Sequence, residues 1–207
     1  SKNPLIRLAW KYLWERKLFN TEFVEDEAFY FAQEGEYQNR IIIPFRKPTG
    51  AVFFFQARAL LNDYPKYLNP DSTQVKASQV LYPFKSDEPV LVCEGPLDAI
   101  SLQLAGINAT ATMGSSPSQA HIETIKDMNC DIVIAYDNDS AGKRGVEKIE
   151  SLRKALMMPS IKICHPPKRY KDWNDAWVGG YDLQEYVSKN TKDYDLQYLI
   201  ETNIESR

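Results

Sequence analysis

The pattern of apolar and polar positions divides this chain into two parts near residue 89. The first part opens with an amphipathic segment in which apolar residues recur at spacings of three and four, as on one face of a helix. A proline stands at its start, where a helix accepts one. These residues are Pro4, Leu5, Leu8, Ala9, Tyr12 and Leu13. The pattern predicts an N-terminal helix.

Two apolar runs and a polar stretch complete the first part. The segment NRIIIPFRKPTGAVFFFQARAL, residues 39–60, reads as two strands around a Pro-Thr-Gly turn. Within it, the run VFFF indicates a buried strand. The stretch NDYPKYLNPDST, residues 62–73, is rich in turn formers and predicts a loop.

From residue 89 onward, short apolar runs alternate with amphipathic segments of helical length. The strand candidates contain PVLVCEG, NATATMG, DIVIAYDND and SIKICHPP, and segments with helical periodicity lie between them. Alternating strands and helices predict a parallel sheet covered on both faces. The fold class expected is therefore α/β, with a smaller mixed α/β subdomain before the parallel sheet.

Composition adds a charge asymmetry to this picture. The 207 residues carry a net charge of −3 and are 43% hydrophobic and 26% charged, which is typical of a folded domain. Residues 40–85 nevertheless carry about +5, and the remainder about −8. A basic face beside an acidic site suits an enzyme that handles phosphates and metal, although chance clustering on a solvated surface explains the charge alone equally well. The three cysteines lack C-x-x-C spacing, so we expect reduced core thiols rather than a zinc site.

Acidic pairs stand at or just after the ends of three predicted strands. They are Glu94 with Asp98, Asp137 with Asp139, and Asp172 with Asp175. In parallel sheets the chemistry lies beyond the carboxyl ends of the strands. If the first and third strands are neighbours, the first two pairs converge, and a divalent cation such as Mg²⁺ offsets their repulsion. The alternative for any one aspartate is a helix cap.

The joint pattern resembles a known family. VCEGPLDAI and AYDNDSAG are similar to the two signatures of the Toprim domain, which occurs in DnaG-type primases, topoisomerases and some nucleases. The basic hairpin, PKYLN and LYPF before them resemble the first half of the primase RNA-polymerase domain. The resemblance covers roughly residues 38–178.

The resemblance implies roles for individual residues. It gives Glu94 the acid–base role and makes Asp98, Asp137 and Asp139 ligands of Mg²⁺ or Mn²⁺. The third acidic motif departs from the usual Asp-x-Asp of cellular primases, because here it reads Asp172-Trp173-Asn174-Asp175. Asp172 is the expected ligand, and Asp175 is left undecided. Such a variant is tolerated in phage-type primases, so a phage or mobile-element origin is expected. The loop with Ser115 and Ser116 resembles one that contacts phosphate, with a plain turn as the alternative.

The basic half is expected to hold the template strand and the incoming nucleotide. Arg40, Arg58, Lys66 and Lys76 are the expected contacts to nucleic acid or triphosphate. For Tyr67 and Phe53–Phe55, core packing is the favoured interpretation.

These observations predict a three-part chain with one activity. The parts are residues 1–88 (basic subdomain), 89–178 (Toprim domain) and 179–207 (C-terminal helical segment). The expected activity is template-directed synthesis of RNA primers on single-stranded DNA from nucleoside triphosphates. A Toprim nuclease and a non-catalytic module that binds DNA or a replication protein are the alternatives. We expect a cytoplasmic protein with no membrane contact, in a bacterium or a phage-infected host. We also expect it to meet a replicative helicase through regions outside this chain.

Overall fold

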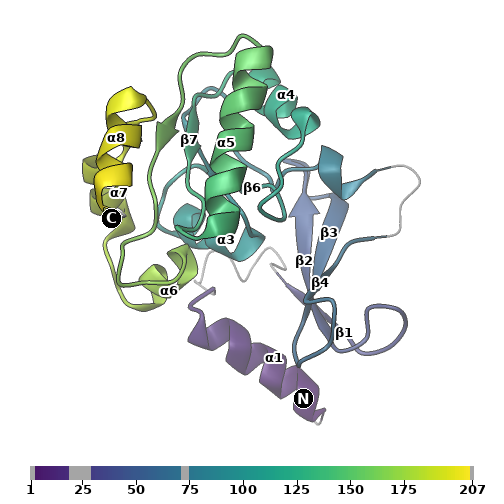
Figure 1. The fold of residues 1–207 in the computed structure, drawn as a ribbon. Helices are drawn as coiled ribbons and strands as arrows, with labels where there is room; N and C mark the ends of the chain where they lie inside the picture. Colours follow the sequence, from purple (N-terminus) through teal and green to yellow (C-terminus); the bar gives the residue numbers. More distant parts are fainter. Residues whose placement is uncertain (1–2, 19–28, 71–74, 206–207) are drawn as a thin grey trace.

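The computed structural model describes residues 3–18, 29–70 and 75–205, and these form two sheets with helices around them (Figure 1). The helices are α1 (Pro4–Glu15), α3 (Pro96–Leu104), α4 (Gln119–Asp127), α5 (Ser140–Ala155), α6 (Trp173–Val178), α7 (Leu183–Asn190) and α8 (Leu196–Glu205), with a 3-10 turn η1 (Ala77–Gln79). The strands are β1 (Tyr30–Ala32), β2 (Arg40–Arg46), β3 (Val52–Ala59), β4 (Tyr67–Leu68), β5 (Val90–Cys93), β6 (Ala109–Ala111), β7 (Ile132–Ile134), β8 (Lys162–Ile163) and β9 (Lys192–Asp193). None of the described helices is both long and apolar enough to cross a bilayer.

Helix α1 begins where the sequence predicts. The side-chain oxygen of Asn3 accepts a hydrogen bond from the Leu5 amide at 2.9 Å, and Pro4 occupies the first turn. Leu13 is buried, but Leu8 is 38% exposed. The predicted helix is confirmed, and the core meets a narrower stripe of it than the apolar spacing covers.

The C-terminal end of α1 is closed by a Schellman motif. The Leu18 amide donates to the Leu13 carbonyl at 3.2 Å, and the Lys17 amide donates to the Trp14 carbonyl at 2.9 Å. Lys17 has a φ of 50°, in the left-handed region that favours glycine. Leu18 is fully buried and anchors the helix end against the rest of the molecule.

The first sheet is antiparallel, in the order β1-β2-β3-β4. The β2–β3 hairpin confirms the predicted pair of strands, and Gly50 in its turn has a φ of 83°. Tyr67 and Leu68 pair with β3, so the loop prediction was wrong at these two residues. This pairing sets Tyr67 opposite Arg58. Residues 71–73 of the predicted loop lie outside the described residues.

The run VFFF is only half buried. Phe54 lies in the core, whereas Val52 and Phe53 are exposed. Alternate residues of a strand point to opposite faces, and only one face of this sheet meets the core here. The prediction of a fully buried strand was therefore wrong for Val52 and Phe53.

The second sheet has the order β6-β5-β7-β8-β9. Strands β6, β5, β7 and β8 are parallel, which confirms the predicted α/β sheet. Its first and third strands, β5 and β7, are neighbours, so the condition for the carboxylates to converge is met. Strand β9 adds an antiparallel edge that the sequence pattern did not reveal. It brings a short piece of the C-terminal segment onto the sheet.

Helices cover both faces of the second sheet. Val90 and Val92 of β5 pack in the cluster that includes residues of α4 and α5. Leu91 and Cys93 pack in the other cluster, with α3 and α6. Burial on both faces explains why β5 is apolar at every position. All three cysteines are buried free thiols, as the sequence predicts.

One apolar core joins the two sheets. The cluster that contains Leu97 and Ile100 of α3 also contains Leu13 of α1 and Ile41 and Phe45 of β2. The first sheet and α1 are therefore packed directly against the α3 side of the second sheet. This shared core sets the position of the basic half relative to the strand ends.

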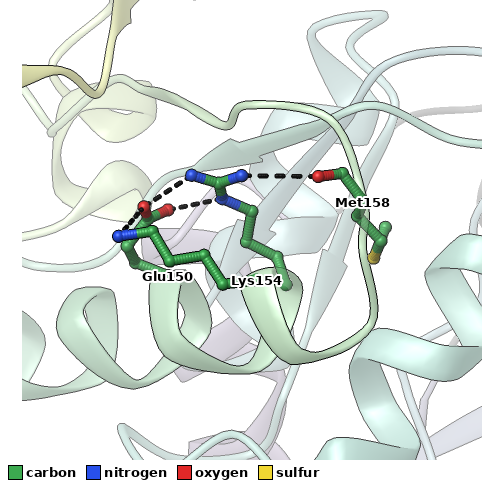
Figure 2. A network of polar contacts seen from close by, with 4 residues as sticks. Glu150, Lys154 and Met158 are labelled. Carbon is green, nitrogen blue, oxygen red and sulfur yellow. Dashed lines mark hydrogen bonds and ion pairs between the residues drawn. The ribbon is translucent and has the colours of Figure 1, made fainter.

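A polar network fixes the chain as it leaves α5 (Figure 2). The Arg153 guanidinium donates to both carboxylate oxygens of Glu150, at 2.7 and 2.6 Å, and to the Met158 carbonyl at 3.3 Å. The Lys154 ammonium lies 3.0 Å from the same carboxylate. The side chains of Glu150 and Arg153 are only 14% and 16% exposed. This geometry is that of a charge-assisted, bidentate pair.

The network predicts a stability difference that depends on pH. Burial raises the pKa of Glu150, but hydrogen bonds from Arg153 and Lys154 outweigh it and hold the pKa below its usual range. A depressed carboxyl pKa stabilises the fold above the unfolded value of about 4.3, and this contribution is lost as the pH falls through the folded value. Glu150→Gln should lower the free energy of unfolding by about 1 kcal/mol at pH 7 and by progressively less toward pH 3.

Urea unfolding of both proteins across this pH range measures the difference. Glu147→Gln, at an exposed position on the same helix, is the matched control. A deficit in Glu150→Gln that persists unchanged at pH 3 would contradict the prediction.

Candidate active site

Carboxyl groups from separate segments meet beyond the carboxyl ends of β5 and β7. Glu94 follows β5, Asp98 lies in the first turn of α3, and Asp137 comes after β7. Asp172 stands at the N-cap of α6. All four line one cavity of about 220 Å³. The convergence expected from parallel neighbouring strands is therefore present for these four side chains.

Gly142 allows α5 to start directly against this cavity. A Cβ atom at Gly142 would lie 2.0 Å from the Asp137 carbonyl oxygen and 3.1 Å from Oε1 of Glu94. Only a residue without a side chain fits such a close approach. The small residues after Asp139 in the sequence therefore serve the packing of the helix against the Asp137 backbone.

The cavity carboxyl groups are electrostatically strained. Burial, followed by repulsion from Asp137 and Asp139, raises the pKa of Glu94 to about 7. Burial and the charge of Asp172 raise the pKa of Asp98 to about 7, although the Asn174 amide, 3.1 Å from Oδ1, partly offsets this. Burial and the charges of Asp172 and Asp139 raise the pKa of Asp137 to about 6. A bound cation would relieve this repulsion.

Asp139 makes a structural contact in addition to its place in the motif. Its Oδ1 accepts hydrogen bonds from the amides of Ala141 and Gly142, each at 2.8 Å, so it is the N-cap of α5. It is exposed and does not line the cavity. Its charge nevertheless acts on Glu94 and Asp137. The cap is therefore present, and a role in metal binding stays a prediction.

The donor set fits a hard divalent cation. Among the described residues, no three or more histidine, cysteine or acidic side chains form a ready-made metal centre. Mg²⁺ often binds through one or two carboxylates, with water and substrate phosphates completing its octahedron. Oε1 of Glu94 is buried without a hydrogen-bond partner. This orphan oxygen and the neighbouring carboxylate oxygens suit such a cation better than a softer one.

Four positive side chains, here called the basic wall, line the same cavity. They are Arg16, Arg58, Lys66 and Lys171. The Arg58 guanidinium donates to the Tyr67 hydroxyl at 2.7 Å and lies 5.1 Å from the ring centres of both Tyr67 and Tyr12. Burial and the neighbouring cations lower the pKa of Lys66. In the described part of the chain, no ion pair joins these four cations to the cavity carboxylates.

Two of the expected basic contacts lie elsewhere. Arg40 is buried, and its guanidinium donates to the Pro65 carbonyl at 2.9 Å, so it supports the loop that carries Lys66. Lys76 is exposed, precedes η1 and does not line the cavity. The structure therefore brings Arg58 and Lys66 to the carboxylates and keeps Arg40 and Lys76 away.

The remaining candidates are also outside the cavity lining. The hydroxyl of Ser116 lies 3.3 Å from the Lys148 ammonium, and Ser115 does not reach the carboxylates. Asp175 is exposed, and its carboxylate accepts a hydrogen bond from the Lys171 amide at 3.3 Å. None of the three therefore belongs to the site that the four carboxylates form.

Arg16, Lys171 and Asn174 line the cavity and were not among the sequence candidates. Lys171 had one local signal, since it directly precedes Asp172. Arg16 had no local signal in the sequence except its place at the end of a predicted helix. Arg16 lies about 80 residues before Glu94 in the chain. Only tertiary packing brings it to the strand ends.

This geometry has close counterparts among known proteins. A family model described as Toprim-like matches residues 91–177. These residues form a Toprim-like domain. The DNA primase of Thermotoga maritima is 30% identical over 169 residues, which cover 77% of this chain and 30% of that protein. The DNA primase of Escherichia coli K12 is 37% identical over 116 residues, which cover 52% of this chain and 20% of that protein.

The fold extends the similarity beyond the Toprim domain. A structure of the DnaG catalytic core covers 93% of this chain with a TM-score of 0.74 and 22% identity, and 75% of that core is covered. A DnaG primase catalytic domain bound to single-stranded DNA matches with a TM-score of 0.70, 21% identity and coverage of 93% and 74%. The basic subdomain and the Toprim domain together therefore have the DnaG catalytic-core fold. The chain spans less than a third of the length of the two curated primases.

Loss of a repelling carboxylate should stabilise the metal-free Toprim domain. Asp137→Asn keeps the shape of the side chain and removes its charge, so the free energy of unfolding should rise, on the order of 1 kcal/mol. The increase in melting temperature that Mn²⁺ produces should shrink, because a charged ligand is gone. Thermal unfolding in chelator and in Mn²⁺ measures both effects. A destabilised Asp137→Asn with a normal response to Mn²⁺ would contradict the metal role.

Two substitutions at Asp139 separate its cap from its charge. Asp139→Ala removes the cap and should destabilise the fold by about 1 kcal/mol, whereas Asp139→Asn keeps an oxygen that can cap α5. If Asp139 also binds metal, both variants should lose part of the Mn²⁺ response in the same melting experiment. A full Mn²⁺ response in Asp139→Asn would mean that Asp139 caps α5 and does not bind the metal.

Proposed function

We propose that this chain is the catalytic core of a primase and joins ribonucleotides on a single-stranded DNA template. The observation that carries the proposal is the cavity in which four cations face four carboxylates without pairing to them. A nucleoside triphosphate with a divalent cation has the charges that such a space accepts. The fold shared with DnaG catalytic cores supports the same assignment.

The cavity residues have two proposed roles, phosphate binding and proton transfer. Arg58, Lys66 and Lys171, with Arg16, bind the triphosphate oxygens and hold it in line with the primer end. Glu94 takes the proton from the attacking 3′-hydroxyl, a role that suits a carboxyl group with a pKa of about 7.

Toprim primases use divalent metal ions, and we propose Mg²⁺ or Mn²⁺ here. Asp98, Asp137 and Asp172 would hold the ion, with Asp139 at the edge of the site. When bound, the ion neutralises charge on the triphosphate and lowers the pKa of the attacking hydroxyl.

The template and the cellular setting belong to the same proposal. A related DnaG catalytic domain binds single-stranded DNA, and we infer a similar template for this chain. The basic wall and the exposed Lys66 suit the phosphates of such a strand. Contact with a replicative helicase, a cytoplasmic location and a phage origin stay predictions.

Primer synthesis on single-stranded DNA tests the proposal directly. With labelled ribonucleotides and Mn²⁺ or Mg²⁺, the wild type should extend short RNA on a mixed-sequence template. Glu94→Gln should reduce the rate at least a hundredfold, because the proton acceptor is lost. The metal-free variant should be at least as stable as the wild type, because the substitution also relieves repulsion from Asp137 and Asp139. Template cleavage without nucleotide incorporation would instead indicate a Toprim nuclease. Binding of DNA with neither reaction would indicate a non-catalytic module.

The basic wall predicts a change in salt dependence. Lys66→Ala should weaken binding to single-stranded DNA or triphosphate and flatten the slope of log affinity against log salt by about 0.7 for a single strand. Lys76→Ala removes an equally exposed lysine outside the cavity and is the matched control. Fluorescence anisotropy between 50 and 200 mM salt measures both slopes. Equal slopes for the wild type and Lys66→Ala would assign Lys66 to an ordinary solvated surface.

A further inference from the structure

In the third acidic motif, the side-chain amide of Asn174 lies where α1, α3 and α6 meet. Asn174 is 1% exposed. Its Oδ1 accepts a hydrogen bond from Nη1 of Arg16 at 2.5 Å, and its Nδ2 donates to the Arg16 carbonyl at 3.0 Å. Nδ2 also donates to Oγ of Ser101 at 2.9 Å, and the Asn174 backbone amide donates to Asp98. One residue of α6 therefore contacts the end of α1 and two residues of α3.

We propose that Asn174 is a positioning residue that latches the C-terminal end of α1 to the Toprim domain and thereby sets the Arg16 guanidinium in the cavity. The inference rests on the proposed function, in which Arg16 binds the triphosphate. Asn174 itself is assigned no contact with the reacting atoms. It acts through Arg16, which it holds at both the backbone and the side chain.

The chemistry of the contacts explains why an amide stands where cellular primases usually carry a second aspartate. Asn174 accepts one hydrogen bond and donates two from the same side chain. An ionised aspartate accepts only, so it would keep the guanidinium and lose both donations. It would also add a charge beside Asp98, whose pKa burial and the charge of Asp172 already raise. In this chain the residue at this position therefore binds the end of α1 instead of a metal ion.

A separate contact from α6 reaches the residue after Arg16 and does not involve the Arg16 side chain. Nε1 of Trp177 donates to the Lys17 carbonyl at 2.9 Å. The last carbonyls of a helix have no partner within the helix, and the carbonyl of the C-cap residue Arg16 is here satisfied from α6. The Lys17 carbonyl, just beyond the helix, is satisfied from α6 as well. The Arg16 guanidinium is also stacked over the Tyr12 ring, with 4.8 Å to its centre. Arg16 is therefore held between Tyr12 and Asn174 while it lines the cavity.

Kinetics of substituted proteins separate positioning from simple stability. Asn174→Ala and Asn174→Asp should each raise the KM for nucleoside triphosphate about tenfold with little change in kcat. Arg16→Ala should raise it as much, and adding Asn174→Ala to Arg16→Ala should raise it no further, since both act through one group. Arg16→Lys keeps the carbonyl contact and a positive charge, so it should fold normally and still raise KM. The rise in melting temperature with Mn²⁺ should remain in all four single variants.

Trp177→Phe is the matched control. It removes a hydrogen bond to the same helix end but leaves the Arg16 side chain in place, so KM should stay unchanged even where stability falls. Independent, additive effects of Asn174→Ala and Arg16→Ala, or a raised KM in Trp177→Phe, would overturn the latch.

Two readouts do not need primer synthesis. Hydrogen exchange of the amides of residues 13–18 should accelerate in Asn174→Ala, and the affinity for ATP in Mn²⁺ should fall about tenfold. If the wild type makes no primers, the proposed function fails, and these two measurements still decide the latch. Unchanged exchange and ATP affinity, or no ATP binding by the wild type, would overturn it.

Discussion

Carboxyl groups at the ends of β5 and β7 repel one another, and the cavity around them has to offset this repulsion. Parallel pairing brings Glu94 and Asp137 to one edge of the sheet, and the first turn of α3 adds Asp98. Burial and mutual repulsion raise the pKa values of all three. Such a site is unfavourable alone and requires positive charge from a bound cation or from the basic side chains that line the same cavity.

Three residues of the basic wall, Arg16, Arg58 and Lys66, reach the carboxylates because the two sheets share one apolar core. Leu13, Ile41 and Phe45 pack in the same cluster as Leu97 and Ile100, and this contact sets the basic subdomain against the strand ends. Attraction between exposed charges is too weak and too strongly screened to hold two subdomains in a fixed geometry. Hydrophobic burial therefore sets the position of the two sheets relative to each other, and the charged side chains determine what the cavity can bind. Asn174 adds a polar contact where α1 reaches the cavity.

Sequence periodicity predicted the larger elements because their burial pattern is regular. The parallel sheet, its flanking helices and the β2–β3 hairpin all followed from such patterns. The apolar pattern did not predict very short strands, and it gave the wrong burial where one face of a strand meets solvent. Strands β4 and β9 have two residues each, and their pairing depends on a partner strand rather than on local spacing. Phe53 reads as a core residue, but the sheet turns it toward solvent.

The carboxylates of the site could be predicted from the sequence, since each follows a predicted strand or opens a predicted helix. The Toprim resemblance could be found in the same way, because both signatures are local. The burial of Arg40, the capping of α5 by Asp139 and the contact between Arg16 and Asn174, 158 residues apart, became visible in the folded structure alone. Sequence periodicity shows on which face of its own helix or strand a side chain lies. The residue that this side chain contacts depends on how distant segments pack, and local spacing carries no information about that packing.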